Sequence, residues 1–318
     1  MNDYPFNLLT DYFVRENHID TTKEYEIVSV PARTLICPNR FDLMAKWIYI
    51  DALEKGGGIE FAKSVYRDNI NAFSCGTFTE YGTESKNSFE IYLEQFDEII
   101  KDIKNNGFDS GKSLVPVGAG NVICDGAHRV TVAAYYNKNV TIIRFPDLTR
   151  RYNYGYFRRF LMSDINMGYM ATMYSRIMPD CYMACLWPIA GRKKIADVTD
   201  LISGYGDIIY SQDVYLTYRG ICNFMTHCYG HQAWTGNIDN HFSGVEACAS
   251  GCYDSRYPVH TYLFQCKNFN HVLHLKQEIR SIFGLGNHSV HIGDNSEETL
   301  MMTRLLYNPN SVPVLINA

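Results

Sequence analysis

Residues 122–145, VICDGAHRVTVAAYYNKNVTIIRF, constrain the fold more than any other segment of this chain. Apolar, β-branched residues stand at both ends, and an alanine-containing stretch with helical spacing lies between them. The pattern predicts a strand, a polar turn at 125–129, a helix and a second strand. Because a helix between two strands packs across a sheet, this segment indicates an α/β fold.

The remainder of the first half is predicted to add further strands and three helices. Residues 25–36 are rich in β-branched side chains, as strands are, and 113–126 predict a hairpin-like pair of short strands. Three stretches have apolar residues at helical spacing: 39–55, 59–73 and 88–106. Ser88 is the expected cap of the last helix. We place the first domain at 1–150, with its edge in the charged segment 147–153.

Alternating strand and helix patterns also fill the second half, residues 151–318. The apolar and aromatic stretch 154–178 has helical spacing, and we expect it to link the halves. Strands are predicted at 181–190, 207–217, 259–266, 289–293 and 312–317. Helices are predicted at 191–206, 270–284 and 296–308. Strands alternating with helices of this length indicate a βαβαβ unit, and hence a second α/β domain.

Composition and charge favour a globular cytoplasmic protein. Hydrophobic residues make up 46% of the chain, which suits a substantial core. No segment approaches the roughly 18 apolar residues of a membrane span, so no membrane partner is expected. The polar N-terminus lacks the pattern of a signal peptide. A formal net charge of −5 without a basic block makes nucleic acid an unlikely partner. Ten cysteines without a CxxC pair are expected to be buried free thiols.

The turn Asp125-Gly126-Ala127-His128-Arg129 carries the clearest functional signal. A strand-to-helix turn needs only a glycine and a cap, and Asp125 is the expected cap. His128 and Arg129 add donors beside the free amides of a helix start, which is a natural anion site. Arginine there also opposes the helix dipole, which stability alone does not favour. The alternative is an ordinary turn in which Arg129 pairs with a nearby acid.

The same segment resembles the signature of the ParB/sulfiredoxin-like superfamily, and the resemblance covers roughly residues 24–146. It implies an N-terminal domain of that type with a helical insertion, in which the turn residues bind nucleotide phosphates: Gly126, Ala127, His128 and Arg129. Sulfiredoxins carry a catalytic cysteine where this chain has Ala127. Partition proteins carry a helix-turn-helix domain where this chain has an α/β pattern. The D-G-x-H-R form is most similar to the free serine kinases.

The resemblance to those kinases implies ATP or ADP as phosphoryl donor and Mg²⁺ as cofactor, with Asp125 as the base or the metal ligand. It also implies a catalytic glutamate upstream. Glu80 is our choice because acids in irregular loops often face sites, although a solvated role is the alternative. The other candidates are Glu54, Glu60, Glu84 and Glu94.

Two further groups are candidates for binding. Arg40 and Lys46 lie near the start of a predicted helix, where they either complete the phosphate pocket or, through an Asp42–Lys46 pair, form a surface salt bridge. In the second half, His291 and Asp294 lie at a strand end, where α/β folds bind ligands, and Asn237 lies in a glycine-containing loop. We predict these as acceptor-binding residues. Helix capping by Asp294 or Asn295 is the alternative.

The sequence thus predicts a nucleotide-dependent phosphotransferase, a kinase that acts on a small hydroxylated molecule or sugar. The two-domain layout resembles that of enzymes of surface polysaccharide metabolism, which we take as the expected setting. A nucleotide-gated switch of ParB type is the first alternative, because the same turn would bind nucleotide without transfer. A DNA-associated nuclease is the second, and the negative net charge disfavours it.

Overall fold

The computed structural model describes residues 4–80, 82 and 86–317. The chain forms two compact units, 1–166 and 167–318, and each contains one sheet, so the mixed α/β class is confirmed. The division falls later than the expected boundary at 150. Helix α6 (Tyr154–Arg159) accounts for the difference, because Phe157 is fully buried within the first unit. The carboxylate of Asp68 also accepts a hydrogen bond from the Ser163 N–H.

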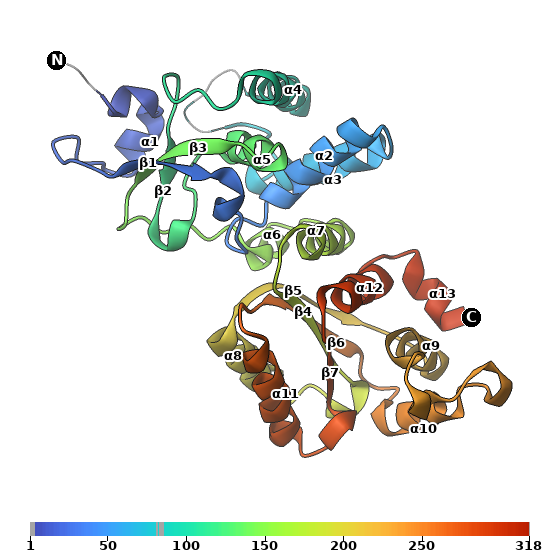
Figure 1. The fold of residues 1–318 in the computed structure, drawn as a ribbon. Coiled ribbons are helices and arrows are strands. Elements are labelled where there is room, and N and C mark those ends of the chain that lie inside the picture. Colours follow the sequence, from blue (N-terminus) through green and yellow to red (C-terminus); the bar gives the residue numbers. More distant parts are fainter. Residues whose placement is uncertain (1–3, 81, 83–85, 318) are drawn as a thin grey trace. The chain divides into compact units, whose positions relative to one another are not determined.

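The first unit has a three-stranded sheet in the order β1-β3-β2 (Figure 1). Its strands are β1 (Ile27–Pro31), β2 (Val115–Val117) and β3 (Asn139–Arg144). Strand β3 is antiparallel to β1 and parallel to β2. Besides α6, its helices are α1 (Asp11–Glu16), α2 (Leu43–Lys55), α3 (Ile59–Phe73), α4 (Phe89–Asn106) and α5 (Ala127–Tyr135). The three helices predicted before the turn are therefore confirmed.

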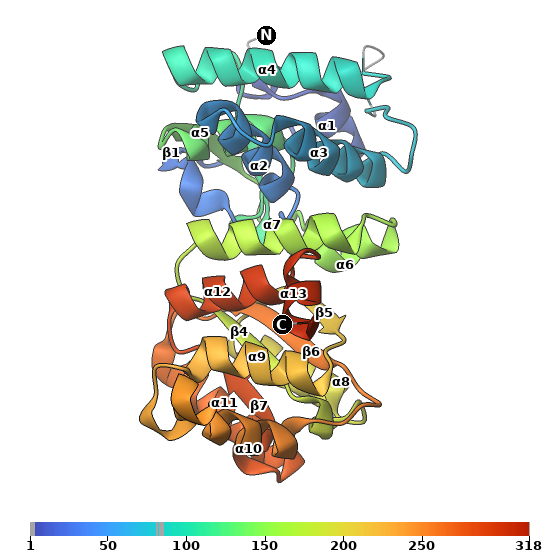
Figure 2. The same cartoon turned by 90° about the vertical axis from the view of Figure 1, so that its right-hand side faces the viewer.

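Helix α2 is the central helix of the first unit. Every residue from Leu43 to Ile50 is buried, and the helix packs against α3 and α5 (Figure 2). Helix α4 is amphipathic instead, and the Ser88 hydroxyl accepts a hydrogen bond from the Ile91 N–H as the predicted cap. A helix buried on all sides must provide partners for its polar residues, which bears on Lys46 below.

The strand predicted directly before the turn is reduced to a single bridge, between Val117 and Ile123. Residues Ala119–Asn121 form a 3-10 turn in which Gly120 has a φ of +67°. Only three residues then separate this turn from Asp125, so no longer strand can pair with β2. The predicted hairpin is present in this minimal form.

The second unit has a four-stranded sheet in the order β5-β6-β4-β7, with every neighbouring pair antiparallel. Its strands are β4 (Cys181–Leu186), β5 (Asp207–Val214), β6 (Val259–Gln265) and β7 (Val290–Ile292). Its helices are α8 (Ile195–Tyr205), α9 (Tyr218–Tyr229), α10 (Ser243–Cys252), α11 (Phe269–Phe283), α12 (Ser296–Leu306) and α13 (Ser311–Asn317). Helix α7 (Asp164–Ile177) begins in the first unit and continues into the second.

The strands and helices of the predicted βαβαβ unit are present, but the order of its strands in the sheet is wrong. Helices α8 and α11 each connect two strands that run in the same direction, but an antiparallel strand lies between the members of each pair. This is the topology of two split β-α-β units. Both helices cover one face of the sheet, where Val198, Ile202 and Leu275 join the apolar core (Figure 1).

The strand predicted at 312–317 is also wrong, because these residues form α13. Pro313 lies in the first turn, where a helix tolerates proline, and Leu315 is the buried residue of the segment. One buried side chain in seven residues does not suit a strand in a sheet. Among the described residues, no helix is both long and apolar enough to cross a membrane.

Candidate functional site

The predicted anion site lies at the N-terminus of α5. Gly126 precedes the helix with a φ of +84°, a left-handed conformation that suits glycine, and no side chain caps the helix. The prediction that Asp125 caps the helix is wrong. Its Oδ1 accepts a hydrogen bond at 2.5 Å from the N–H of Gly126, which precedes the helix. The first amides of α5 therefore remain available to a ligand.

Arg129 lies beside this helix start without an ion pair or hydrogen bond to any residue that the structure describes. Its guanidinium folds over Gly126, where a β-carbon would lie 2.9 Å from Nη2. Asp125 and Arg129 line a cavity of about 150 Å³ together with Lys112, Ser113 and Thr10. Among the described residues, Arg129 therefore does not form the ion pair with a nearby acid that the alternative predicted.

His128 points elsewhere, into an aromatic cluster. Its Nε2 lies 2.8 Å from the hydroxyl of Tyr66, and its ring contacts Phe96 at a centroid distance of 4.8 Å. Burial, together with the nearby cations Lys46 and Lys86, holds the pKa of His128 well below its usual value of 6.5. His128 is therefore neutral at pH 7, and it does not line the cavity that Arg129 lines.

Arg40 and Lys46 form a buried network with Asp42, rather than a surface salt bridge. Nε and Nη2 of Arg40 each lie 2.9 Å from an oxygen of the Asp42 carboxylate, and Nζ of Lys46 lies 3.0 Å from Oδ2. Burial alone would raise the pKa of Asp42, but the two cations outweigh it and lower that pKa. Asn69 accepts a further hydrogen bond from Lys46.

This network also positions the turn. The Nη1 atom of Arg40 donates a hydrogen bond at 2.7 Å to the carbonyl oxygen of Ile123, two residues before Asp125. Arg40 and Lys46 donate their hydrogen bonds to groups inside the protein and do not line the cavity. Their role is to hold the segment that leads into the turn.

The predicted catalytic glutamate, Glu80, forms an ion pair with Lys86. The ammonium group of Lys86 also lies 5.1 Å from the ring centre of Tyr92. This pair belongs to the surroundings of His128 and does not line the cavity beside Arg129. The alternative candidate Glu84 lies outside the described residues.

The side chains of the three predicted acceptor-binding residues have different partners within the second unit. Asn237 caps the short 3-10 helix Ile238–Asn240 with its side chain. Asp294 is exposed, and its carboxylate lies 3.3 Å from Nζ of Lys276. His291 is buried, and its Nε2 lies 2.9 Å from Oε1 of Glu298.

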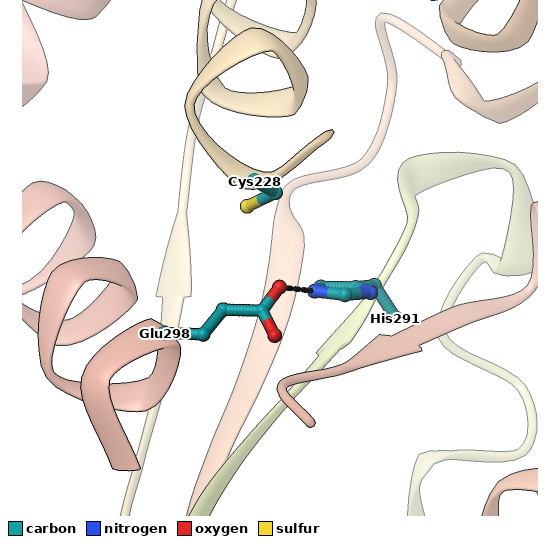
Figure 3. Close-up of side chains that lie close together, drawn as sticks. All are labelled: Cys228, His291 and Glu298. Carbon is teal, nitrogen blue, oxygen red and sulfur yellow. Dashed lines mark hydrogen bonds and ion pairs between the residues drawn. The ribbon is translucent and has the colours of Figure 1, made fainter. Parts of the chain in front are cut away.

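His291 belongs to a cluster that sequence reasoning did not identify. Glu298 from α12 and Cys228 from α9 approach it from two sides (Figure 3). The capping alternative explains part of this region, because Asn295 accepts a hydrogen bond from the Glu298 N–H. Cys228 lies far from His291 in the sequence, so no local spacing connects the two.

No protein-family model matches this chain, and no curated protein or solved structure is significantly similar to it.

Proposed function

We propose that the protein is a nucleotide-dependent phosphotransferase whose phosphate site is the cavity at the start of α5. The observation that supports this most is the side chain of Arg129, which has no protein partner among the described residues and lines a cavity near the uncapped start of α5, although Gly126 and Ala127 do not line it. A guanidinium and backbone N–H groups at one place are the donors that phosphate oxygens require. Lys112 lines the same cavity and adds a second cation.

The cavity suits the phosphate end of a nucleotide. Its volume of about 150 Å³ is below the roughly 300 Å³ at which pockets for whole drug-sized ligands begin. The base and sugar would therefore extend beyond it. In this proposal Arg129 and the amides orient the phosphates and stabilise the charge that is transferred, which is the main task of the protein in phosphoryl transfer.

Asp125 is the acidic residue that lines the cavity, and it suits the two roles proposed for it. One oxygen is held by the Gly126 N–H, whereas Oδ2 accepts no hydrogen bond from a described residue. A single carboxylate with a free oxygen can accept a proton from an acceptor hydroxyl. It also fits Mg²⁺, which commonly takes one or two carboxylates and completes its shell with phosphate oxygens and water.

The class of acceptor is proposed from the D-G-x-H-R turn. Its resemblance to the ParB/sulfiredoxin-like superfamily, and to the free serine kinases within it, supports a small hydroxylated molecule or sugar. In this proposal His128 has a positioning role, because its contacts with Tyr66 and Phe96 anchor the first turn of α5.

Calorimetric titration of ATP, ADP and CTP, each with Mg²⁺, tests the proposal. We expect one nucleotide to bind the unmodified protein and Arg129→Ala to weaken it at least tenfold, or about 1.4 kcal/mol. Arg158→Ala is the matched control, because Arg158 forms an exposed ion pair with Asp164. Equal affinity of the two variants, or no binding of any nucleotide, would contradict the phosphate site.

Transfer is then assayed with radiolabelled nucleotide and a panel of hydroxylated acceptors. Label on an acceptor, lost in Asp125→Asn, supports the phosphotransferase. Binding with slow hydrolysis that no acceptor accelerates would favour the nucleotide-gated switch instead.

A further inference from the structure

Three side chains of metal-ligand type converge inside the second unit, independently of the proposed phosphotransferase site. Cys228 comes from the last turn of α9, His291 from β7 and Glu298 from the first turn of α12 (Figure 3). One potential ligand atom from each lies within 4.8 Å of the other two. The cluster is assembled from three elements, and the tertiary fold brings its members together.

The carboxylate of Glu298 is held in place by its own helix start. The N–H of Asp294 donates a hydrogen bond at 2.7 Å to Oε2 of Glu298, while Asn295 caps the helix. These contacts fix one oxygen and direct the other, Oε1, toward Nε2 of His291. A preorganised carboxylate loses little side-chain freedom when it binds an ion.

The thiol of Cys228 has no hydrogen-bond partner among the described residues, although the residue is 2% exposed. Cys185 on β4 is the direct cross-strand partner of His291, so the two side chains lie on the same face of the sheet. It is also fully buried. A second sulfur is therefore close to the cluster.

A nucleophilic cysteine supported by a His-Glu pair is the main alternative, and the geometry disfavours it. In such a triad the imidazole presents one nitrogen to the thiol and the other to the carboxylate. Here Nε2 faces Glu298, and in Figure 3 the sulfur of Cys228 lies toward that same edge of the ring. A thiol buried to this degree is also closed to a substrate, as inert structural cysteines are.

The structure assigns to Cys228, His291 and Glu298 a binding site for one divalent transition-metal ion of the zinc class. Sulfur, imidazole nitrogen and carboxylate oxygen are the three donor types that Zn²⁺ accepts, and three protein ligands leave a fourth position for water or for Cys185. One thiolate and one carboxylate balance the charge of the ion, which is required at a buried site. The hard ions Mg²⁺ and Ca²⁺ are excluded by the sulfur donor.

Cobalt substitution tests the site in the full chain without a histidine tag. The metal-free protein is titrated with Co²⁺, and the thiolate-to-cobalt absorption in the near ultraviolet is recorded. We expect saturation at one Co²⁺ per chain and displacement by one equivalent of Zn²⁺. Cys228→Ser should remove the thiolate absorption that Cys228 contributes, leaving at most that of Cys185, and His291→Gln and Glu298→Gln should each weaken binding at least tenfold.

Cys181→Ser is the matched control, since Cys181 is a buried cysteine on β4 outside the cluster, and it should bind Co²⁺ as the unmodified protein does. Failure of the unmodified protein to bind Co²⁺ saturably, or a thiolate band of unchanged intensity in Cys228→Ser, would overturn the assignment.

X-ray absorption of the zinc-loaded, unmodified protein keeps the test decisive if the variants do not fold. One or two sulfur ligands at about 2.3 Å, with nitrogen or oxygen completing the shell, support the site. A shell without sulfur overturns it.

Discussion

The phenolic oxygen of Tyr66 on α3 lies 2.8 Å from Nε2 of His128 on α5, and this contact joins the turn to the aromatic core. Tyr66 is fully buried and His128 is half-buried, so removal of the Tyr66 hydroxyl leaves the Nε2 atom of His128 without its partner. We expect Tyr66→Phe to lower the free energy of unfolding by about 1–3 kcal/mol. Urea denaturation followed by circular dichroism measures this.

Tyr136→Phe is the control for Tyr66→Phe. The Tyr136 hydroxyl donates to Glu54 at an exposed position, and its loss should cost at most about 0.5 kcal/mol. Equal losses of unfolding free energy in the two variants would show that the Tyr66–His128 hydrogen bond stabilises the protein no more than the exposed Tyr136–Glu54 bond.

The lowered pKa of His128 predicts a loss of stability in acid. The unfolded chain takes up a proton near the usual pKa of 6.5, whereas the folded chain keeps His128 neutral to a lower pH. The unfolded state thus binds more protons below pH 6.5, and stability falls as the pH falls, with a limiting slope of about 1.4 kcal/mol per pH unit.

His128→Gln should reduce that dependence between pH 6.5 and 5, because the amide does not titrate. Urea midpoints at several pH values measure the difference, and His18→Asn, at an exposed histidine, serves as the control. An unchanged pH dependence in His128→Gln would mean that other groups cause the acid sensitivity. Besides burial, the charged groups that shift the pKa of His128 in the folded state are Lys46, Lys86, Asp42 and Arg129.

Asp42 balances two cations inside the first unit, and its charge is therefore indispensable. Asp42→Asn keeps the shape of the side chain but leaves Arg40 and Lys46 buried without a counter-ion. We expect a loss of about 3–5 kcal/mol, or failure to fold. Glu60→Gln, which breaks an exposed pair with Lys63, should change stability by less than about 0.5 kcal/mol. A small effect at Asp42 would show that water reaches the network.

The Asn295 cap should matter for α12 in the metal-free protein. Its side chain accepts a hydrogen bond from the Glu298 N–H at 2.9 Å. We expect Asn295→Ala to destabilise the protein by about 1 kcal/mol in thermal unfolding with a chelator present. Asn287, exposed and without a side-chain hydrogen bond to a described residue, is the control position. Matching melting temperatures for the two alanine variants would argue against the cap.

Elements with strong local signals were predictable from the sequence. Helix α4 has a complete apolar stripe with Ser88 before it and Gly107 after it, and both ends are where the sequence predicts them. The direction of strands in the second unit was not predictable in this way. Strand–helix alternation is the same whether the strands are neighbours or an antiparallel strand lies between them, and only long-range pairing decides this.

The opposite orientations of His128 and Arg129 could have been anticipated. Adjacent residues on a helix point about 100° apart, since a turn takes 3.6 residues, so both cannot face one ligand equally. His291 and Glu298 lie in one polar segment of the sequence, but no such local signal connects Cys228 to them. The members of this cluster lie on different elements, and their meeting depends on how α9 and α12 pack against the sheet.

The guanidinium of Arg129 occupies the space where a β-carbon of residue 126 would point. A β-carbon at position 126 would lie 2.9 Å from Nη2 of that arginine, in a backbone conformation with a φ of +84°. Because Gly126 has no β-carbon, there is room for the guanidinium of Arg129 beside it. A side chain at position 126 would therefore displace the guanidinium from its place beside the start of α5, so a substitution at Gly126 is also a change to Arg129.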